Sequence, residues 1–153
     1  MSVRDPLTYK STSQWAAWTP FGAVAWTSSG TDPAIGNGTL SASYRRIGTT
    51  GFYRGVIKMG TTTTYGTGGW VVDLPDGWVA SSALGVSALQ AGFAVLNDTG
   101  TGTYDGRCYA DVNGTVLNFV AGSPWAVVAA TAPFTWTNGD YLSWNIVLEL
   151  DYE

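Results

Sequence analysis

Apolar and polar residues alternate most regularly in the last stretch of the chain, residues 141–153. The apolar side chains take the even positions: Leu142, Trp144, Ile146, Leu148, Leu150 and Tyr152. Between them the odd positions are polar, and Val147 is the single exception. A period of two is typical of a strand with one buried face and one solvent-exposed face. Such a strand is stable only when another apolar face covers it. We therefore predict a central strand here, added to the sheet last, after a turn at Asn138-Gly139-Asp140.

Two hairpins are predicted upstream of this strand. Strand-like runs over 39–47 and 52–59 are joined by a four-residue loop, Gly48 to Gly51. A second pair of runs, 104–112 and 115–120, is joined by Asn113-Gly114. Asn-Gly is the strongest short-range hairpin signal, because both residues tolerate positive φ.

The remaining strands are predicted from shorter patterns. We expect them at residues 21–28, 70–74 and 91–97, with a short edge strand near Val127. The Thr- and Gly-rich run 61–69 has no apolar pattern and is expected to be an exposed loop, and the Ala-rich run 79–90 is ambiguous.

The whole pattern predicts an all-β fold, an antiparallel β-sandwich or jelly roll of seven to eight strands connected by Gly-rich turns. Residues 1–13 are polar, and residues 14–18 could form one short helical turn, which Pro20 ends. We expect residues 1–20 to be an N-terminal arm that reaches a neighbour, and residues 21–153 to be the β-sandwich domain.

The amino-acid composition limits the kinds of partner that this protein can be expected to bind. The chain has 153 residues, of which 45% are hydrophobic and only 12% charged, so Thr, Ser, Gly and Asn must form much of the surface. A net charge of −4 with seven Lys and Arg offers no basic stripe, and nucleic acid is not expected as a ligand. The absence of a long apolar run predicts no membrane insertion and no secretory signal, with synthesis in a cytoplasm-like space.

The residues available for catalysis are few. The chain has no histidine, which excludes Ser/His/Asp and Cys/His catalysis, and its one cysteine, Cys108, lies in an alternating apolar row that predicts a buried thiol. A glycosidase would have to use Asp105 with Asp111, or Asp73 with Asp76. We favour solubilising strand and turn roles for these four carboxylates.

Cofactors and metals are not expected. Residues 98–105 carry Asp, Thr and Gly that could wrap calcium, but their spacing matches no EF-hand loop, so a plain loop is favoured. The sequence predicts no enzymatic activity, no catalytic residue, no cofactor and no metal site.

The aromatic content is the most unusual feature, with eight Trp and eight Tyr. Trp144 is assigned to the core by its alternation, and Trp70 with it. Aromatic side chains in arms and loops suit a subunit interface or a sugar-stacking platform, and we favour the interface. The interface or ligand candidates are Trp15, Trp18, Trp78, Trp125, Trp136, Arg45 and Arg46.

The cations of the first predicted hairpin can be interpreted in two ways. Arg45, Arg46, Arg54 and Lys58 are either solvated and paired strand charges or contacts to an acidic neighbouring subunit.

Several short motifs together resemble a known family over roughly residues 18–153. They are Asn37-Gly38-Thr39, Tyr44-Arg45-Arg46-Ile47-Gly48, Phe52 to Gly60 followed by Thr61-Thr62-Thr63, Leu74-Pro75, Trp136, Gly139-Asp140 and the closing strand. This set resembles the β domains of bacteriophage virion surface proteins, found in small tail and fibre proteins and in capsid-attached decorations.

The resemblance implies a virion-surface location after synthesis in the host cytoplasm, no enzymatic activity, and a homotrimer that contacts other virion proteins. A fibre protein would normally carry a long N-terminal shaft, whereas about twenty residues precede the domain here, which favours a capsid decoration or tail-associated cap. The alternative is the receptor- or glycan-binding domain of a tail fibre, with a host-surface glycan as ligand.

Overall fold

Ten β-strands and no helix make up the part of the chain that the computed structural model describes, residues 17–83 and 90–151. The predicted helical turn over 14–18 lies largely outside it. Every pairing between strands is antiparallel, which confirms the predicted all-β class. The strand count is higher than predicted, partly because two strands of two residues each join the sheet. The strands are β1 Thr19–Pro20, β2 Trp26–Ser28, β3 Thr39–Ile47, β4 Thr50–Lys58, β5 Trp70–Asp73, β6 Gln90–Asp98, β7 Gly102–Ala110, β8 Val116–Ala121, β9 Ala126–Val127 and β10 Tyr141–Glu149.

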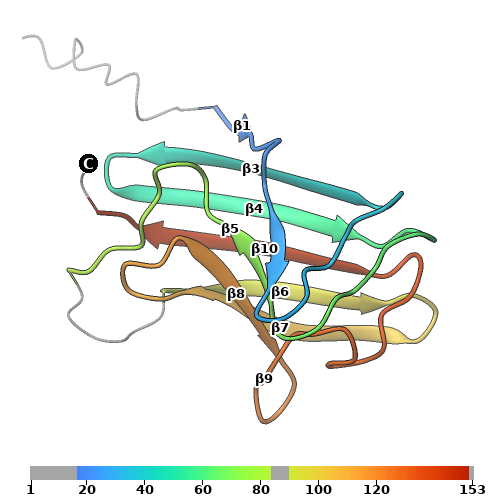
Figure 1. Cartoon of the computed structure of the whole chain (residues 1–153). Coiled ribbons are helices and arrows are strands. Elements are labelled where there is room, and N and C mark those ends of the chain that lie inside the picture. Colours follow the sequence, from blue (N-terminus) through green and yellow to red (C-terminus); the bar gives the residue numbers. More distant parts are fainter. Residues whose placement is uncertain (1–16, 84–89, 152–153) are drawn as a thin grey trace, which may run out of the picture.

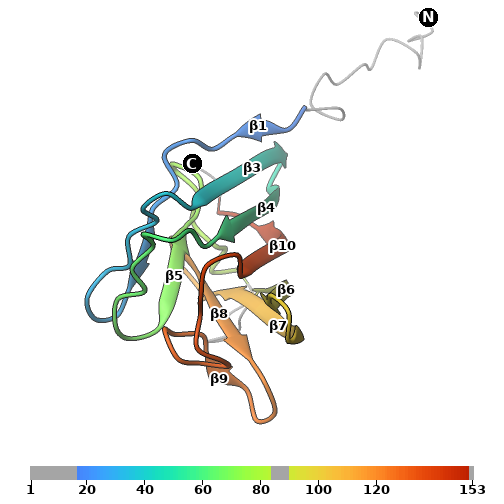
Figure 2. The same ribbon diagram turned by 90° about the vertical axis from the view of Figure 1, so that its right-hand side faces the viewer.

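The strands form one sheet that curls over itself. Its order is β1-β3-β4-β10-β6-β7-β8-β5-β2, and β9 pairs with β8. Figure 1 shows β3, β4, β10, β6 and β7 as one layer that β8, β5 and β2 cross, and Figure 2 shows the two layers side by side. β10 lies between β4 and β6, which confirms the prediction of a central last strand.

The core fills the space between these two layers. Leu142, Trp144, Ile146 and Leu148 of β10 are all buried, as the alternation predicts. Trp70 of β5 is also fully buried, and its ring lies between those of Trp26 and Trp136, with centroids 4.8 and 5.0 Å away. The predicted core roles of Trp144 and Trp70 are confirmed.

The first hairpin has a tighter turn than the sequence suggested. Ile47 pairs directly with Thr50, so the predicted four-residue loop is wrong and the turn consists of Gly48 and Thr49. Gly48 adopts φ 60°, a conformation that suits glycine at the first position of a two-residue hairpin turn. Because the turn has only two residues, Thr50 pairs with Ile47 and is the first residue of β4.

The second hairpin is present but open at its turn. β7 and β8 pair only from Gly106 to Tyr109, while Asn113 at the turn has φ 59°. Near the turn β8 pairs instead with β5, and Ala80 accepts a hydrogen bond from the Asn113 amide and donates one to the Gly114 carbonyl. The predicted hairpin is confirmed, but its connection is residues 111–115 rather than Asn113-Gly114 alone, and the sheet changes layer at this point.

The other short predictions have mixed outcomes. The strand predicted over 21–28 is restricted to β2, and the edge strand near Val127 is β9. Residues 61–69 contain no strand, as predicted, but they are hydrogen-bonded to the preceding loop, for example by reciprocal backbone bonds of 2.8 and 2.9 Å between Ala34 and Thr64. Residues 84–89 of the ambiguous run lie outside the described residues.

Candidate functional site

One face of the larger layer points away from the core, and we call it the outer face. It is made of the side chains of β3, β4, β10, β6 and β7 that alternate with the buried ones. The pairing register places one row straight across these strands: Ser43, Arg54, Asn145, Phe93 and Arg107.

The outer face carries unusually exposed apolar side chains. Phe93 is 80% exposed and Val147 53%, and Phe52 pairs with Val147 across β4 and β10. A hollow of about 430 Å³ lies beside them, lined by Gly92, Phe93, Asn145, Ile146 and Val147. Beyond β7, Trp125 in the β8–β9 connection and Val127 on β9 are 49% and 52% exposed. Grouped exposed apolar side chains are typical of interaction sites rather than of ordinary surface.

The cations of the outer face lie against aromatic rings. The guanidinium carbon of Arg54 is 3.9 Å from the centre of the Trp18 ring, and its Nε donates to Ser43 Oγ at 3.1 Å. The guanidinium carbon of Arg45 lies 5.1 Å from the centre of the Trp18 ring and 4.6 Å from the centre of the Phe52 ring. Such stacking holds a guanidinium in a defined orientation while its N–H groups can still bind carboxylates.

The opposite rim of the outer face repeats this arrangement. The guanidinium carbon of Arg107 lies 4.8 Å from the centre of the exposed Trp125 ring. Two members of the row, Arg54 and Arg107, therefore each lie against an aromatic ring, and the exposed Phe93 lies between them.

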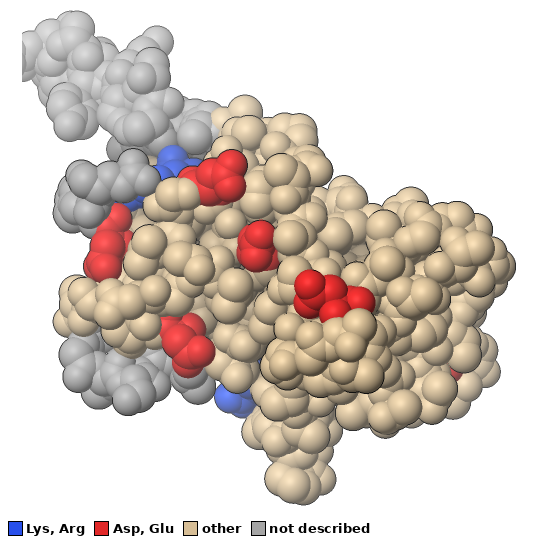
Figure 3. Space-filling model, viewed as in Figure 1, with Lys and Arg blue, Asp and Glu red and all other residues tan. Residues whose placement is uncertain are grey.

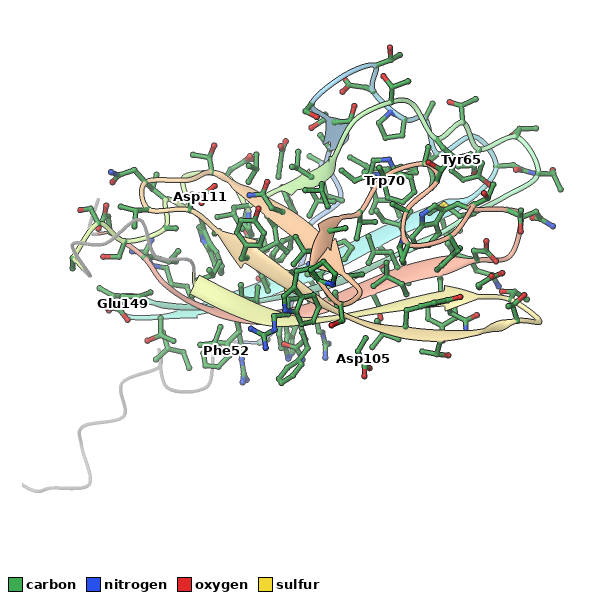
Figure 4. All side chains as sticks on the ribbon, turned by 90° about the horizontal axis from the view of Figure 1, so that it is seen from below. Phe52, Tyr65, Trp70, Asp105, Asp111 and Glu149 are labelled. Atoms are coloured by element: carbon green, nitrogen blue, oxygen red, sulfur yellow. The ribbon has the colours of Figure 1, made fainter. Side chains whose placement is uncertain are left out.

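Cations are concentrated on the outer face of the described structure. Four cations project from the outer face, Arg45, Arg54, Lys58 and Arg107, with the carboxylates of Asp105 and Glu149. Elsewhere the described residues include one cation, Arg46, and seven carboxylates: Asp32, Asp73, Asp76, Asp98, Asp111, Asp140 and Asp151. Figure 3 shows the side opposite the outer face, where acidic groups are scattered and little basic surface is visible. Figure 4 shows Phe52 and Asp105 projecting from the outer face and Asp111 on the other side.

Three of the residues predicted as interface or ligand candidates lie on the outer face or at its rim. Trp18 and Arg45 lie together over β3, and Trp125 lies at the far rim. Trp15 lies outside the described residues.

Two predicted surface tryptophans are core residues instead. Trp78 is 5% exposed, and its ring packs against Tyr44 and covers Gly51. Trp136 is 2% exposed, and its Nε1 donates to the carbonyl of Ala129 at 3.0 Å. Their assignment to the surface was wrong, because the Trp78 ring packs against the β3–β4 hairpin and the Trp136 ring packs against Trp70 of β5.

Arg46 does not share a surface with Arg45. Adjacent strand residues point to opposite faces, and the Arg46 guanidinium donates to the carbonyls of Gly48 at 2.8 Å and Asp151 at 3.2 Å. It ties the β3–β4 turn to the end of β10, so its inclusion among the interface candidates is corrected. Because Arg45 and Arg46 are adjacent in a predicted strand, the sequence alone could have placed them on opposite faces.

Sequence reasoning missed four members of the outer face: Phe52, Phe93, Val147 and Arg107. One signal was available, since Val147 is the apolar residue that breaks the alternation of the last strand. Phe93 gave no such signal, because its neighbours Gly92 and Ala94 are small and its run read as continuously apolar.

Of the two carboxylate pairs considered for catalysis, one is separated and the other lines a single hollow. Asp105 lies on the outer face and Asp111 follows the end of β7, about 20 Å further along the chain at about 3.3 Å per residue. Asp73 and Asp76 line one hollow of about 280 Å³. Burial, and then the charge of Asp76, raise the pKa of Asp73, which is the shift that any two neighbouring carboxylates in a partly buried site produce.

The other reactive groups have structural partners. Cys108 is fully buried, as predicted, and burial raises the pKa of its thiol to about 12, which leaves it a poor nucleophile. Asp140 is also buried, and its carboxylate accepts hydrogen bonds from the amides of Thr99 at 2.8 Å and Thr137 at 2.6 Å. Residues 98–105, considered for calcium, form a three-residue turn and the ends of two paired strands. Among the described residues, no three potential metal-ligating side chains lie together.

Comparison with known proteins finds no relative: no family model, no curated protein and no solved structure matches this chain. Within the described residues, no helix has the length and apolar character needed to cross a membrane.

Proposed function

We propose that this chain is a non-enzymatic structural protein of a bacteriophage virion surface, acting as a homotrimeric capsid decoration or tail-associated cap. The observation that carries the proposal is the outer face, where Phe93 and Val147 stand exposed between cations that aromatic rings hold in place. A sheet face that combines exposed apolar side chains with polar and charged ones has the composition of a protein interface.

The virion part of the proposal rests on the short motifs described above. They include the Tyr44-Arg45-Arg46-Ile47-Gly48 run and the Gly139-Asp140 turn before the last strand. Residues 1–20 are proposed to anchor the protein to neighbouring virion proteins. Trp18, which lies over Arg45 and Arg54, would fix the point where this arm meets the domain.

The oligomeric state tests this proposal directly. Light scattering on the purified chain at micromolar concentration should give three times the 16.2 kDa mass of one copy. Phe93→Ser should lower that mass while circular dichroism still shows a folded β protein, because the side chain is exposed in the isolated subunit. A matched control, Thr103→Ser, changes an exposed β7 position that lies away from the apolar centre and should leave the mass unchanged. A monomeric wild type would contradict the proposal.

A second candidate function is glycan binding by a tail fibre domain. The observation in its favour is the half-exposed ring of Trp125, which has the Arg107 guanidinium beside it as a hydrogen-bond donor. Aromatic faces with nearby polar groups suit sugar rings. A glycan array with wild type and Trp125→Ala tests it: hits lost in the variant support this function, and an array without hits counts against it.

A further inference from the structure

We infer that the β3–β4 half of the outer face binds an acidic saccharide, with Arg45 and Arg54 holding its carboxylate and the polar hollow beside them holding the sugar ring. We call this place the two-arginine site. The inference rests on the glycan-binding candidate above, for which it names the class of sugar and a site apart from Trp125. It does not depend on the trimer.

One tryptophan ring brings the two arginines together. The antiparallel pairing of β1 with β3, extended by one residue, puts Trp18 opposite Arg45. Arg54 lies on the neighbouring strand, diagonal to Arg45, because it pairs with Ser43. Both guanidinium carbons lie within 5.1 Å of the centre of the Trp18 ring. Two cations from neighbouring strands are therefore held at one aromatic ring.

Most of the hydrogen-bonding capacity of these two cations is unused. A guanidinium group carries several N–H donors in a fixed fork. Arg54 donates its Nε–H to Ser43 Oγ, and Arg45 Nε is buried without a partner, so ring stacking holds the Arg45 side chain. No carboxylate of the described residues forms an ion pair with either arginine. Their Nη groups can therefore bind an oxyanion through paired hydrogen bonds.

A polar hollow lies directly beside Arg54. Its volume is about 390 Å³, and its lining includes the hydroxyls of Ser41 and Ser43 and the amide of Asn145. Ser41 and Asn145 are exposed, and their side chains make no hydrogen bond to a described residue. Hydroxyl and amide groups both donate and accept hydrogen bonds, as the hydroxyls around a sugar ring do. Small-molecule sites have volumes of about 300–1,000 Å³, a range that includes this hollow.

Charge and lining together identify the occupant as an acidic saccharide. Two cations without a carboxylate between them attract an anion, which a neutral sugar does not supply. None of the exposed large apolar side chains of the described residues lines the hollow, whereas a protein partner needs such anchors. A sugar carboxylate next to hydroxyls satisfies both parts of the site. Phe93, on β6, stays available for the contact between copies.

A glycan array with hexuronic- and sialic-acid glycans beside their methyl-esterified forms tests the inference. Esterification removes the charge of the carboxylate and retains the sugar ring. The wild type should bind the acidic forms, and esterification should weaken binding by about tenfold or more, because charge-assisted hydrogen bonds are lost. Calorimetry with a short acidic oligosaccharide chosen from the hits then gives the affinity per subunit, which multivalent binding does not raise.

Substitutions locate the site on the outer face. Arg45→Gln and Arg54→Gln should each weaken binding by about tenfold or more, because each removes a charged fork of donors. Arg54→Lys should weaken it by about threefold or more, because an ammonium keeps the charge but not the paired hydrogen bonds.

Lys58→Gln is the matched control, because it removes one positive charge from the same face of the same strand. Lys58 lies four residues from Arg54, about 13 Å along the strand at about 3.3 Å per residue. It is therefore beyond the Debye length of about 8 Å, and its substitution should change the affinity by less than about twofold. Circular dichroism confirms that each variant is folded.

The outcomes separate this inference from the candidate function on which it rests. Equal binding of acidic and esterified glycans overturns it, and so does unchanged binding by folded Arg45→Gln/Arg54→Gln. An equal loss in Lys58→Gln and Arg54→Gln also overturns it, in favour of general attraction by the face. Loss of binding in Trp125→Ala alone overturns it and leaves the glycan-binding candidate standing. An array without hits counts against both, and light scattering still decides the trimer.

Discussion

The hydroxyl of Tyr53, on β4, donates a hydrogen bond of 2.9 Å to the backbone carbonyl of Asp73, on β5. β4 belongs to the larger layer and β5 to the smaller one, so this bond joins the two layers across the core. The ring of Tyr53 is fully buried, and it packs edge-on against Trp144 with centroids 5.7 Å apart.

Removing that hydroxyl should weaken the contact between the layers. We expect Tyr53→Phe to lower the free energy of unfolding by about 1 kcal/mol, because a buried hydrogen bond is lost with little change in volume. The melting temperature should fall by about 2–4 °C. Tyr44→Phe is the matched control, since Tyr44 pairs with Tyr53 across β3 and β4 and its hydroxyl has no hydrogen bond to a described residue. Equal losses in the two variants would contradict this role of Tyr53.

Alkaline pH should destabilise the fold. Burial, and then the charge of Asp73, raise the pKa of Tyr53 above its usual range, and burial raises that of Cys108 to about 12. The folded state therefore retains protons that the unfolded state releases above about pH 8.5 for Cys and about pH 10 for Tyr. Stability is unaffected by these groups below those values and is lost as pH rises from them toward the raised pKa values of the folded state.

Urea unfolding between pH 7 and pH 11 measures this loss. The double variant Tyr53→Phe/Cys108→Ala should show a smaller decline in unfolding free energy than wild type. Some decline should remain, because the pKa of Tyr65 is also raised, by burial and by the charge of Asp140. The same slope in both proteins would argue against the buried thiol and phenol as its source.

Two buried tryptophans should differ in their response to the same substitution. Trp70 Nε1 donates to the carbonyl of Tyr65 at 3.0 Å, whereas Trp144 Nε1 is shielded from solvent and has no partner among the described residues. Both Trp→Phe changes remove the same atoms. We expect Trp70→Phe to cost about 1–3 kcal/mol more than Trp144→Phe, because only the first leaves a carbonyl without its donor. Denaturant titration checks the order, and a greater loss in Trp144→Phe would reverse it.

Gly55 is required by the ring that lies over it. A Cβ at Gly55 would overlap Trp144 and approach the carbonyl oxygen of Ser41 at 2.8 Å. Gly55→Ala should cost about 1–3 kcal/mol by overpacking, and adding Trp144→Phe should recover part of that loss. Gly102→Ala is the control, since nothing lies within 4 Å of its Cβ position. Additive losses in the Gly55 and Trp144 double variant would contradict the clash.

The sequence by itself determined the strands and most of their buried faces. The alternation over 141–153 predicted β10, its buried side chains and its central place, and the Asn113-Gly114 pair predicted the second hairpin. These features follow from backbone geometry over a few neighbouring residues, because alternate side chains on a strand always point to opposite faces. The burial of Cys108 and Trp144 follows from the same rule.

Only the tertiary structure decided which of the remaining aromatics and charges meet. Trp78 and Trp136 stand among turn-forming residues, and their burial depends on how loops close the ends of the curled sheet. The approach of Trp18 to Arg54 and the exposure of Phe93 depend on strand register and order. Register and order bring together residues far apart in the sequence, so no local pattern specifies them.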